Sequence, residues 1–177
     1  MHLNFETSAV RFAIEHMSEY MPSDKQIWNS LKSKCLTRQA REFLWKCMHK
    51  AYKCGSYWGN IPNHEHKAKC PVCQIEESME HILTDCEALG QKVVWELART
   101  LWKMKFTSWP QIGYGTILGR GLANFKTLLG KPDTGKNWLF QILVSESAFL
   151  IWKIRCERRI QREDDREKFH STQEIHN

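Results

Sequence analysis

With 177 residues, a net charge of +6 and 42% hydrophobic residues, the chain has the composition of a folded globular protein and not of a disordered one. It has no run of eighteen apolar residues, and its first ten residues do not resemble a signal peptide. We therefore expect an intracellular protein, of the nucleus or the cytoplasm, that has no membrane partner. Seven cysteines, an odd number, indicate free thiols and metal ligation rather than a framework of disulfides.

The charge is distributed unevenly along the chain. Residues 24–69 have ten basic and three acidic side chains, a net charge of +7, and residues 90–136 have eight and two, a net charge of +6. Between them, residues 70–89 have five acidic side chains and no lysine or arginine. Such a basic surface fits a polyanion such as nucleic acid, and the alternative is a solvated surface that keeps the protein soluble.

Two helices are predicted at the start of the chain. Apolar residues at helical spacing predict the first over residues 8–21, with Ser8 as its N-cap and Pro22 as its end. Ser23 and Asp24 can cap a second, shorter helix, whose apolar residues are Ile27, Trp28 and Leu31.

The clearest amphipathic helix is predicted over residues 37–53. Its apolar stripe consists of Ala40, Phe43, Leu44, Cys47, Met48 and Ala51. The other faces have mostly basic side chains, which makes this helix the best candidate for contacts with phosphate groups. The alternative for any one of these side chains is a solvated helix face.

The second half of the chain predicts two further helices, over residues 89–105 and 136–156, the second largely buried. Between them, Pro110 and four glycines predict a loop, and the run from Gly113 to Gly119 lacks the Gly-Lys-Ser/Thr ending of a phosphate-binding loop. Residues 157–168 have five basic and five acidic side chains, which predicts a solvated helical extension or a frayed tail. Strand signals are weak throughout, so the predicted fold class is mainly α.

The sequence Cys70-Pro-Val-Cys73, followed by His81 and Cys86, has a spacing typical of a zinc site. Zinc prefers four tetrahedral nitrogen and sulfur ligands, and two cysteines separated by two residues form a tight turn, in which proline restricts φ. His81 and Cys86 can converge on one ion from a slightly distorted helical turn or a helix end. Because all four positions would be filled, no open coordination site remains. We predict one structural zinc ion (Zn²⁺).

Alternatives to these ligands remain open. Cys70 and Cys73 could be a redox pair, although no thioredoxin-like strand and helix surround them. His64 or His66 could replace a predicted ligand, or the four residues could have this spacing by chance. The remaining cysteines are predicted to be packing residues, and these are Cys35, Cys47, Cys54 and Cys156.

The surroundings of the motif fit a metal site. Three thiolates and one imidazole around zinc have a formal charge of −1, which Lys67 and Lys69 immediately upstream could offset. The acidic residues between the ligands are expected to face solvent. Since the segment has few large apolar residues, metal binding would supply its folding energy, on the order of 10 kcal/mol in small zinc modules.

These residues resemble the zinc-binding segment that follows the polymerase, and often a ribonuclease H domain, in the reverse transcriptases of non-LTR retrotransposons. The matching pieces are Phe43-Leu-Trp45 with His49, the Cys70-Pro-Val-Cys73 turn, and Glu80-His81-Ile-Leu with Cys86 and Trp95. They fall within residues 25–105, and softer similarity in the flanks extends the resemblance over most of the chain.

The resemblance implies a small helical domain organised around a CCHC zinc knuckle, with a C-terminal helical extension. We accordingly divide the chain into an N-terminal linker helix (1–23), a reverse-transcriptase-type zinc-binding domain (24–110), and a loop with a long C-terminal helix and a charged tail (111–177). In such elements this region is thought to hold template RNA or target DNA. Its partners would be RNA or DNA and the upstream reverse transcriptase and ribonuclease H domains.

The catalytic parts of that family are missing. A polymerase needs a Tyr-x-Asp-Asp metal site, and the only adjacent aspartates, Asp164 and Asp165, lie in the charged tail. A ribonuclease H site needs carboxylates on a mixed sheet, which the sequence does not predict. We therefore predict no enzyme and no small-molecule substrate. The expected function is a non-catalytic zinc module, from a truncated or degenerate copy of such an element, that binds RNA or DNA weakly and in a salt-dependent way.

Basic side chains near the motif are the predicted nucleic-acid contacts, namely Arg38, Arg41, Lys46, Lys50, Lys53, Lys67 and Lys69. Nearby aromatic residues that could stack on bases are Tyr52, Tyr57 and Trp58. The simplest expectation for five other tryptophans is that they anchor a core or an interface, and these are Trp45, Trp95, Trp102, Trp138 and Trp152. The alternative function is a zinc-stapled helical module that binds another protein and no nucleic acid.

Overall fold

The computed structural model describes residues 5–177, and this part of the chain is mainly helical and has no strand. The helices are α1 (Phe5–Ser18), α2 (Asp24–Ser30), α3 (Arg38–Met48), α4 (Ser56–Gly59), α5 (Leu89–Lys103), α6 (Tyr114–Gly119), α7 (Thr134–Ile160) and α8 (Thr172–His176). Short 3-10 turns lie at Glu65–Ala68, Arg120–Leu122 and Arg166–Lys168, and a π turn at His81–Asp85. The mainly α class is confirmed. Within residues 5–177, no helix is long and apolar enough to cross a membrane.

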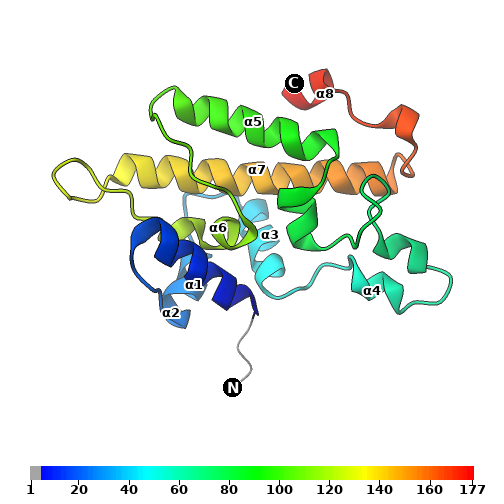
Figure 1. Cartoon of the computed structure of the whole chain (residues 1–177), viewed down its shortest axis with the longest axis horizontal. Helices are drawn as coiled ribbons and strands as arrows, with labels where there is room; N and C mark the ends of the chain where they lie inside the picture. Colours follow the sequence, from blue (N-terminus) through cyan, green and yellow to red (C-terminus); the bar gives the residue numbers. More distant parts are fainter. Residues whose placement is uncertain (1–4) are drawn as a thin grey trace.

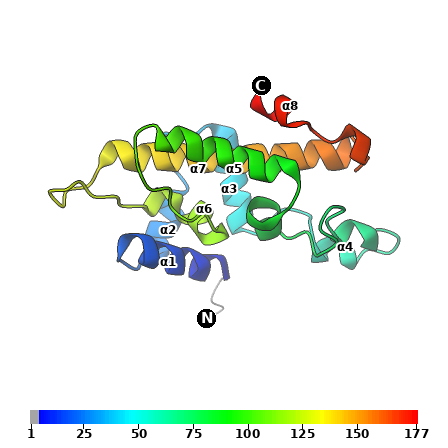
Figure 2. The ribbon, with the colours of Figure 1, turned by 45° about the horizontal axis from the view of Figure 1, so that its top comes forward.

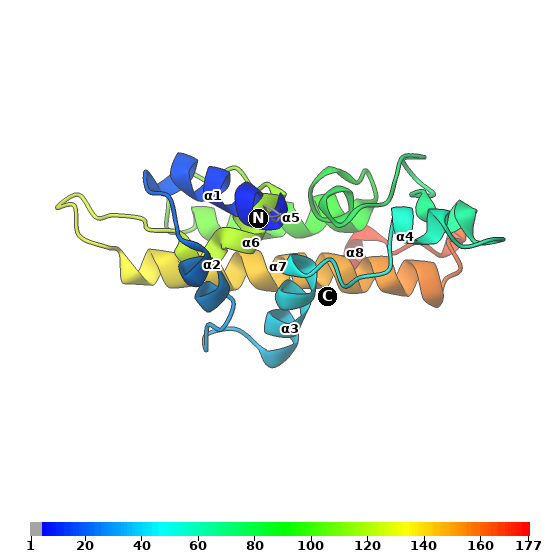
Figure 3. The same cartoon turned by 90° about the horizontal axis from the view of Figure 1, so that it is seen from below.

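Helix α7 lies along the long axis of the molecule, and α5 packs beside it (Figure 1 and Figure 2). In Figure 1, α1, α2 and α6 lie across α7 from α5, and α4 lies near the C-terminal end of α7. The close approach of α5 depends on Gly90, because a Cβ atom there would lie 2.7 Å from the Cγ2 atom of Ile154. Helix α3 packs on α7 from another side (Figure 3).

Trp102 of α5 is at the centre of the aromatic core. It is fully buried, and its ring lies 4.6–5.7 Å, between centroids, from those of Phe106, Trp109, Phe125 and Phe140. Its indole N–H donates to the carbonyl oxygen of Ser108 at 2.6 Å, which satisfies the one polar group that burial would otherwise strand.

One hydrophobic core joins the three predicted parts of the chain. It includes Val10 of the first part, Phe43 and Val94 of the second, and Ile151 of the third. The boundaries at residues 23 and 110 stay predictions. Trp45 and Trp138 are 50% and 61% exposed, so these two tryptophans do not belong to the core.

Local sequence signals explain α2 well and α1 less well. Ser23 caps α2, and its side chain forms a reciprocal capping box with Gln26, as residue types at these positions favour. The first helix runs over Phe5–Ser18, so Ser8 lies inside it and is not its N-cap. The chain leaves the helix before Pro22, and Glu19 already has a φ of +56°.

Helix α3 is shorter than predicted and ends at Met48 rather than at residue 53. The predicted apolar face is buried up to that point. Lys50 has a φ of +49°, in the left-handed region, which an α-helix cannot continue through. Lys50 and Lys53 therefore follow the helix and do not extend its basic face.

The loop predicted around the glycines of residues 113–121 contains a helix, α6, which is buried along its whole length. It packs directly on α1. A Cβ atom at Gly115 would lie 2.2 Å from the carbonyl oxygen of Ala9, and one at Gly119 would lie 3.0 Å from Ile14. The two glycines are four residues apart on one helix face. They serve close helix packing rather than a flexible loop.

Candidate metal centre

Cys70, Cys73, His81 and Cys86 come together in the structure. One ligand atom from each side chain lies within 4.8 Å of the other three, and the sulfur atoms of Cys70 and Cys73 lie 3.8 and 4.0 Å from that of Cys86. Four ligands at about 2.3 Å from one ion in a tetrahedron lie about 3.8 Å apart. The three thiols are free, and the prediction that these four side chains lie close enough to hold a metal ion is confirmed.

Cys70 and Cys73 lie on a tight turn whose flanking residues form an isolated antiparallel bridge. The backbone N–H of Cys70 donates to the carbonyl of Ile75 at 2.8 Å, and that of Gln74 donates to the carbonyl of Cys70 at 2.9 Å. Gln74 has a φ of +61°, which reverses the chain direction just after the second cysteine. Backbone hydrogen bonds thus fix the first two sulfurs.

His81 and Cys86 are brought together by the π turn. In an α-helix, residues five apart are separated by about 140° around the axis, so their side chains diverge. Here the N–H of Cys86 donates to the carbonyl of His81 at 2.8 Å, a bond between residues five apart. This wider turn places residues five apart on one side of the helix. Of the two predicted alternatives, a distorted helical turn or a helix end, the structure has a distorted turn, and it ends at Cys86.

The crowding of the sulfur atoms changes how readily they ionise. The pKa of the Cys70 thiol is lowered to about 3, chiefly because Cys86 donates a hydrogen bond to its sulfur. The pKa of the Cys86 thiol is raised, because it supplies that hydrogen bond and because it is buried. Three thiolates so close together repel one another, and a bound cation removes that repulsion.

His81 also fits a metal site. Its side chain is only 4% exposed, and within residues 5–177 neither ring nitrogen makes a hydrogen bond. A buried imidazole that lacks a partner costs free energy, and coordination of a metal by one nitrogen would offset it. The donor set of three sulfurs and one imidazole nitrogen is the type that zinc prefers.

Glu77, between the second and third ligands, has no exposed area. Its carboxylate accepts hydrogen bonds from the guanidinium groups of Arg155, of Arg158 at 3.3 Å and of Arg159 at 2.8 Å. The expectation that the acidic residues of this segment face solvent is therefore wrong for Glu77. Paired, hydrogen-bonded charge can be buried where a single charge cannot.

The same arginines correct the prediction of a solvated or frayed tail from residue 157. Helix α7 continues to Ile160, and Arg158 is only 5% exposed. Arg159 also donates to the backbone carbonyls of Lys67 at 2.8 Å and Lys69 at 3.1 Å. Arg155, Arg158 and Arg159 have the i, i+3, i+4 spacing of one helix face, which the sequence could have revealed. Their partner lies 78 or more residues upstream and could not be found that way.

The two alternative histidines lie apart from the ligand cluster. His64 and His66 are exposed, and the cluster contains neither of them.

The two lysines upstream of the motif and the other cysteines lie in different surroundings. The Nζ atom of Lys67 lies 5.2 Å from the centre of the Trp58 ring, and Lys69 is exposed. Of the other cysteines, Cys47 is fully buried, as predicted for a packing residue, whereas Cys35 is exposed.

The predicted nucleic-acid contacts fall on separate surfaces. Lys53, Lys67 and Lys69 line one groove beside the metal centre. Arg41 lines a different cleft on α3. The remaining three are Arg38, which is exposed, Lys46, which pairs with Glu42 at 2.7 Å, and Lys50, which pairs with Glu6 at 3.1 Å. The structure thus brings together three of the seven.

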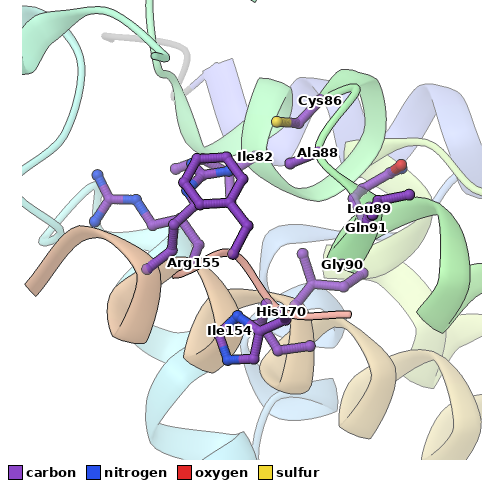
Figure 4. A pocket seen from close by; sticks show the side chains of 12 residues that line it. Ile82, Cys86, Ala88, Leu89, Gly90, Gln91, Ile154, Arg155 and His170 are labelled. Atoms are coloured by element: carbon purple, nitrogen blue, oxygen red, sulfur yellow. The ribbon is translucent and has the colours of Figure 1, made fainter. Parts of the chain in front are cut away.

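A small apolar pocket of about 40 Å³ lies beside Cys86. It is lined by the π turn, the start of α5, the α7 helix, and Phe169 with His170 from the tail. Figure 4 shows Cys86 at one side of the pocket and His170 with Ile154 at the other. The volume suffices for a few water molecules and not for an organic substrate.

Comparisons of the chain with protein-family models, with curated proteins and with solved structures find no match. The resemblance to the retrotransposon segment therefore stays a prediction. Function has to be argued from the chemistry of the site.

Proposed function

We propose that this chain is a non-catalytic module that holds one structural zinc ion at Cys70, Cys73, His81 and Cys86 and binds RNA or DNA beside it. The approach of the four ligand atoms to within 4.8 Å of one another carries the proposal. A site of three sulfurs and one imidazole nitrogen suits zinc better than it suits metals that prefer oxygen ligands. In this proposal the cysteines and the histidine form a CCHC knuckle.

The role of the ion is structural. Four protein ligands complete a tetrahedral shell and leave no open position for a substrate or a reactive water. The first two ligands come from the turn and the other two from the π turn, so one ion cross-links two pieces of irregular chain. Binding free energy at such a site stabilises the fold.

A groove of about 790 Å³ beside the metal centre supports a nucleic-acid partner. Its lining includes the basic residues Lys53, Lys67 and Lys69 and the aromatic residues Tyr52, Trp58 and Trp152. Arg155 and Arg159 line it too, but both pair with Glu77. Glu163 and Asp164 also line it, but Asp164 is paired with Arg159 at 2.7 Å. Basic side chains interleaved with aromatic rings suit a phosphate backbone with stacked bases.

We also propose that the module derives from the C-terminal part of a non-LTR retrotransposon reverse transcriptase. The resemblance supports this origin, and so does the contact between two of its pieces. The indole N–H of Trp95 donates to the carbonyl of Leu83 at 2.7 Å, which fastens α5 to the π turn. The two residues therefore form one local unit.

The metal part is tested by the zinc content of the purified chain. We expect about one zinc per chain, and loss of the metal in a Cys70→Ser, Cys86→Ser variant. Cys35→Ser is the matched control, because Cys35 is exposed and outside the cluster. A wild-type chain without stoichiometric metal contradicts the proposal.

The nucleic-acid part is tested by the salt dependence of binding. Each phosphate contact contributes about 0.7–0.9 to the slope of log K against log salt. Replacing Lys53, Lys67 and Lys69 together by glutamine should therefore lower the slope by about 2–3. A matched triple replacement of the exposed Lys92, Lys103 and Lys105 should leave it nearly unchanged. Salt-independent binding, or none, rules out this part.

One observation favours the second candidate, a zinc-stapled module that binds another protein. Leu128 and Leu129 are 107% and 85% exposed at the turn between α6 and α7. Adjacent exposed leucines suit an apolar partner surface. Capture of one protein partner that a Leu128→Ser, Leu129→Ser variant loses, with no nucleic acid bound, would favour this candidate.

A further inference from the structure

An open aromatic cleft lies between α2 and α3, in a part of the surface that contains no residue of the metal centre. It has a volume of about 570 Å³. His49 lies between two tryptophans in it, with its ring centroid 5.0 Å from that of Trp28 and 4.0 Å from that of Trp45. Lys32 and Arg41 line the same cleft.

Trp28 packs partly against the hydrophobic core, but core packing does not account for Trp45 and His49. The buried face of α3 consists of Ala40, Phe43, Leu44, Cys47 and Met48. Arg41, Trp45 and His49 are spaced four residues apart and line a different face, where Trp45 is 50% exposed. A half-exposed tryptophan tilted against an exposed histidine leaves apolar ring surface open to a ligand.

The charge around the cleft favours an anionic ligand. Residues 31–41 have four basic side chains and no acidic one. In the described part of the chain, neither Lys32 nor Arg41 forms an ion pair with a carboxylate. The one acidic residue of the cleft, Glu42, is paired with Lys46 at 2.7 Å.

We infer that this aromatic cleft binds an unpaired nucleobase of single-stranded nucleic acid. The base stacks against Trp45, and Arg41 and Lys32 contact the adjoining phosphates. A duplex keeps its base faces inside the helical stack and would use only the two basic side chains. The inference rests on the proposed function for the identity of the ligand, but it places the contact away from the metal-side groove.

The test compares a short labelled oligothymidylate with a duplex hairpin by fluorescence anisotropy, using the zinc-loaded full chain. Trp45→Ala should weaken binding of the single strand by about ten-fold, the effect of removing one base–aromatic stack, and change duplex binding by less than two-fold. Trp45→Phe should retain most of the single-strand affinity. Trp138→Ala is the matched control, because Trp138 is an exposed helical tryptophan outside the cleft.

A second variant separates charge from stacking. Arg41→Gln should weaken binding of both the single strand and the duplex. It should also lower the slope of log K against log salt by about one for each. Since Arg41 and Trp45 are partly exposed, circular dichroism and zinc content should match those of the wild type. If Trp45→Ala nevertheless unfolds, the other measurements test the inference. It then requires that the wild type prefers the single strand, that Trp45→Phe retains most of the single-strand affinity and that Arg41→Gln weakens binding of both oligonucleotides.

The outcomes distinguish this inference from the proposed function. Unchanged single-strand binding by Trp45→Ala, or equal losses for single strand and duplex, overturns the aromatic cleft. In that case the proposed function still stands if the Lys53, Lys67 and Lys69 replacements reduce the salt slope. A wild-type chain that binds neither oligonucleotide overturns both.

Discussion

The aromatic core around Trp102 and the metal-binding segment (residues 65–88) are held together by different forces. In the core, rings pack on rings, and most of the buried side chains are apolar. The metal-binding segment buries only a few apolar side chains, and its other buried groups are Glu77, His81 and two cysteines. The core therefore depends on total apolar area, whereas the segment depends on a few specific groups that each need a partner.

This difference has a consequence for how each region fails. Losing one apolar contact in a core removes a part of a large sum, and the neighbours relax partly around the gap. Losing one partner in the metal-binding segment leaves a thiolate, an imidazole or a carboxylate buried without compensation. We therefore expect the segment to fail as a unit and the core to fail gradually.

The largest effect should come from removing the metal. A chelator should raise amide hydrogen exchange over residues 65–88, because a binding free energy on the order of 10 kcal/mol is lost from a segment with little apolar core. The amides of α5 around Trp102 should stay much better protected. Exchange that rises equally in both regions would contradict the division into two differently stabilised parts.

The next largest effect is expected for Glu77→Gln. The amide keeps the shape of the side chain but leaves Arg155 without its anion and Arg158 and Arg159 with Asp164 alone, so the free energy of unfolding should fall by about 3–5 kcal/mol. Glu87→Gln is the matched control at an exposed position of the same segment, with an expected change below about 0.5 kcal/mol. Urea unfolding of zinc-loaded protein measures both. Similar midpoints for the two variants would show that the ion cluster adds no stability.

A third prediction tests the helical part through a matched pair of glycines. Gly115→Ala forces a methyl group against the backbone of Ala9 and should destabilise the fold by about 1–3 kcal/mol or more. Gly113→Ala, two residues earlier, meets no atom within 4 Å and should be nearly neutral. Thermal unfolding compares them. Two neutral substitutions would mean that α1 and α6 can separate freely.

The helices were predictable where local signals decide them. The capping box of Ser23 and the apolar period predicted over residues 89–105 depend on neighbours in sequence, and both helices begin where predicted. Helix α6 was missed because glycine has two uses. It permits turns, and it permits close helix packing, and only the position of α1 distinguishes them.

The candidate site divides in the same way. The four predicted ligands follow from spacing and ligand chemistry, and the structure brings them together. The burial of Glu77 depends on α7, far along the chain, so no local pattern reveals it. The seven predicted basic contacts share one sign of charge, but their placement on separate surfaces depends on where α3 ends and how the chain folds back.

The smallest effect concerns Cys54, which precedes the metal-binding segment. Burial raises the pKa of its thiol, as it does for a thiol in the core. Burial is the main cause that raises its pKa to about 11, from about 9 in an unfolded chain. The opposite shift, to about 3, applies to Cys70 within the ligand cluster. Position beside the segment is therefore not enough to make a thiol ionise.

Because the folded-state pKa of Cys54 is raised, the unfolded chain releases this proton first as the pH rises. Its contribution to stability is complete below pH 9 and is lost as the pH rises towards 11. We expect the free energy of unfolding to fall over that interval by about 2 kcal/mol more in the wild type than in Cys54→Ala. Urea titrations at several pH values measure the free energy of unfolding of both proteins. Taking the difference between them cancels the contribution of the buried tyrosines, which ionise in both. Parallel pH curves would mean that this thiol is as solvated in the folded chain as in the unfolded one, and would place Cys54 outside the core.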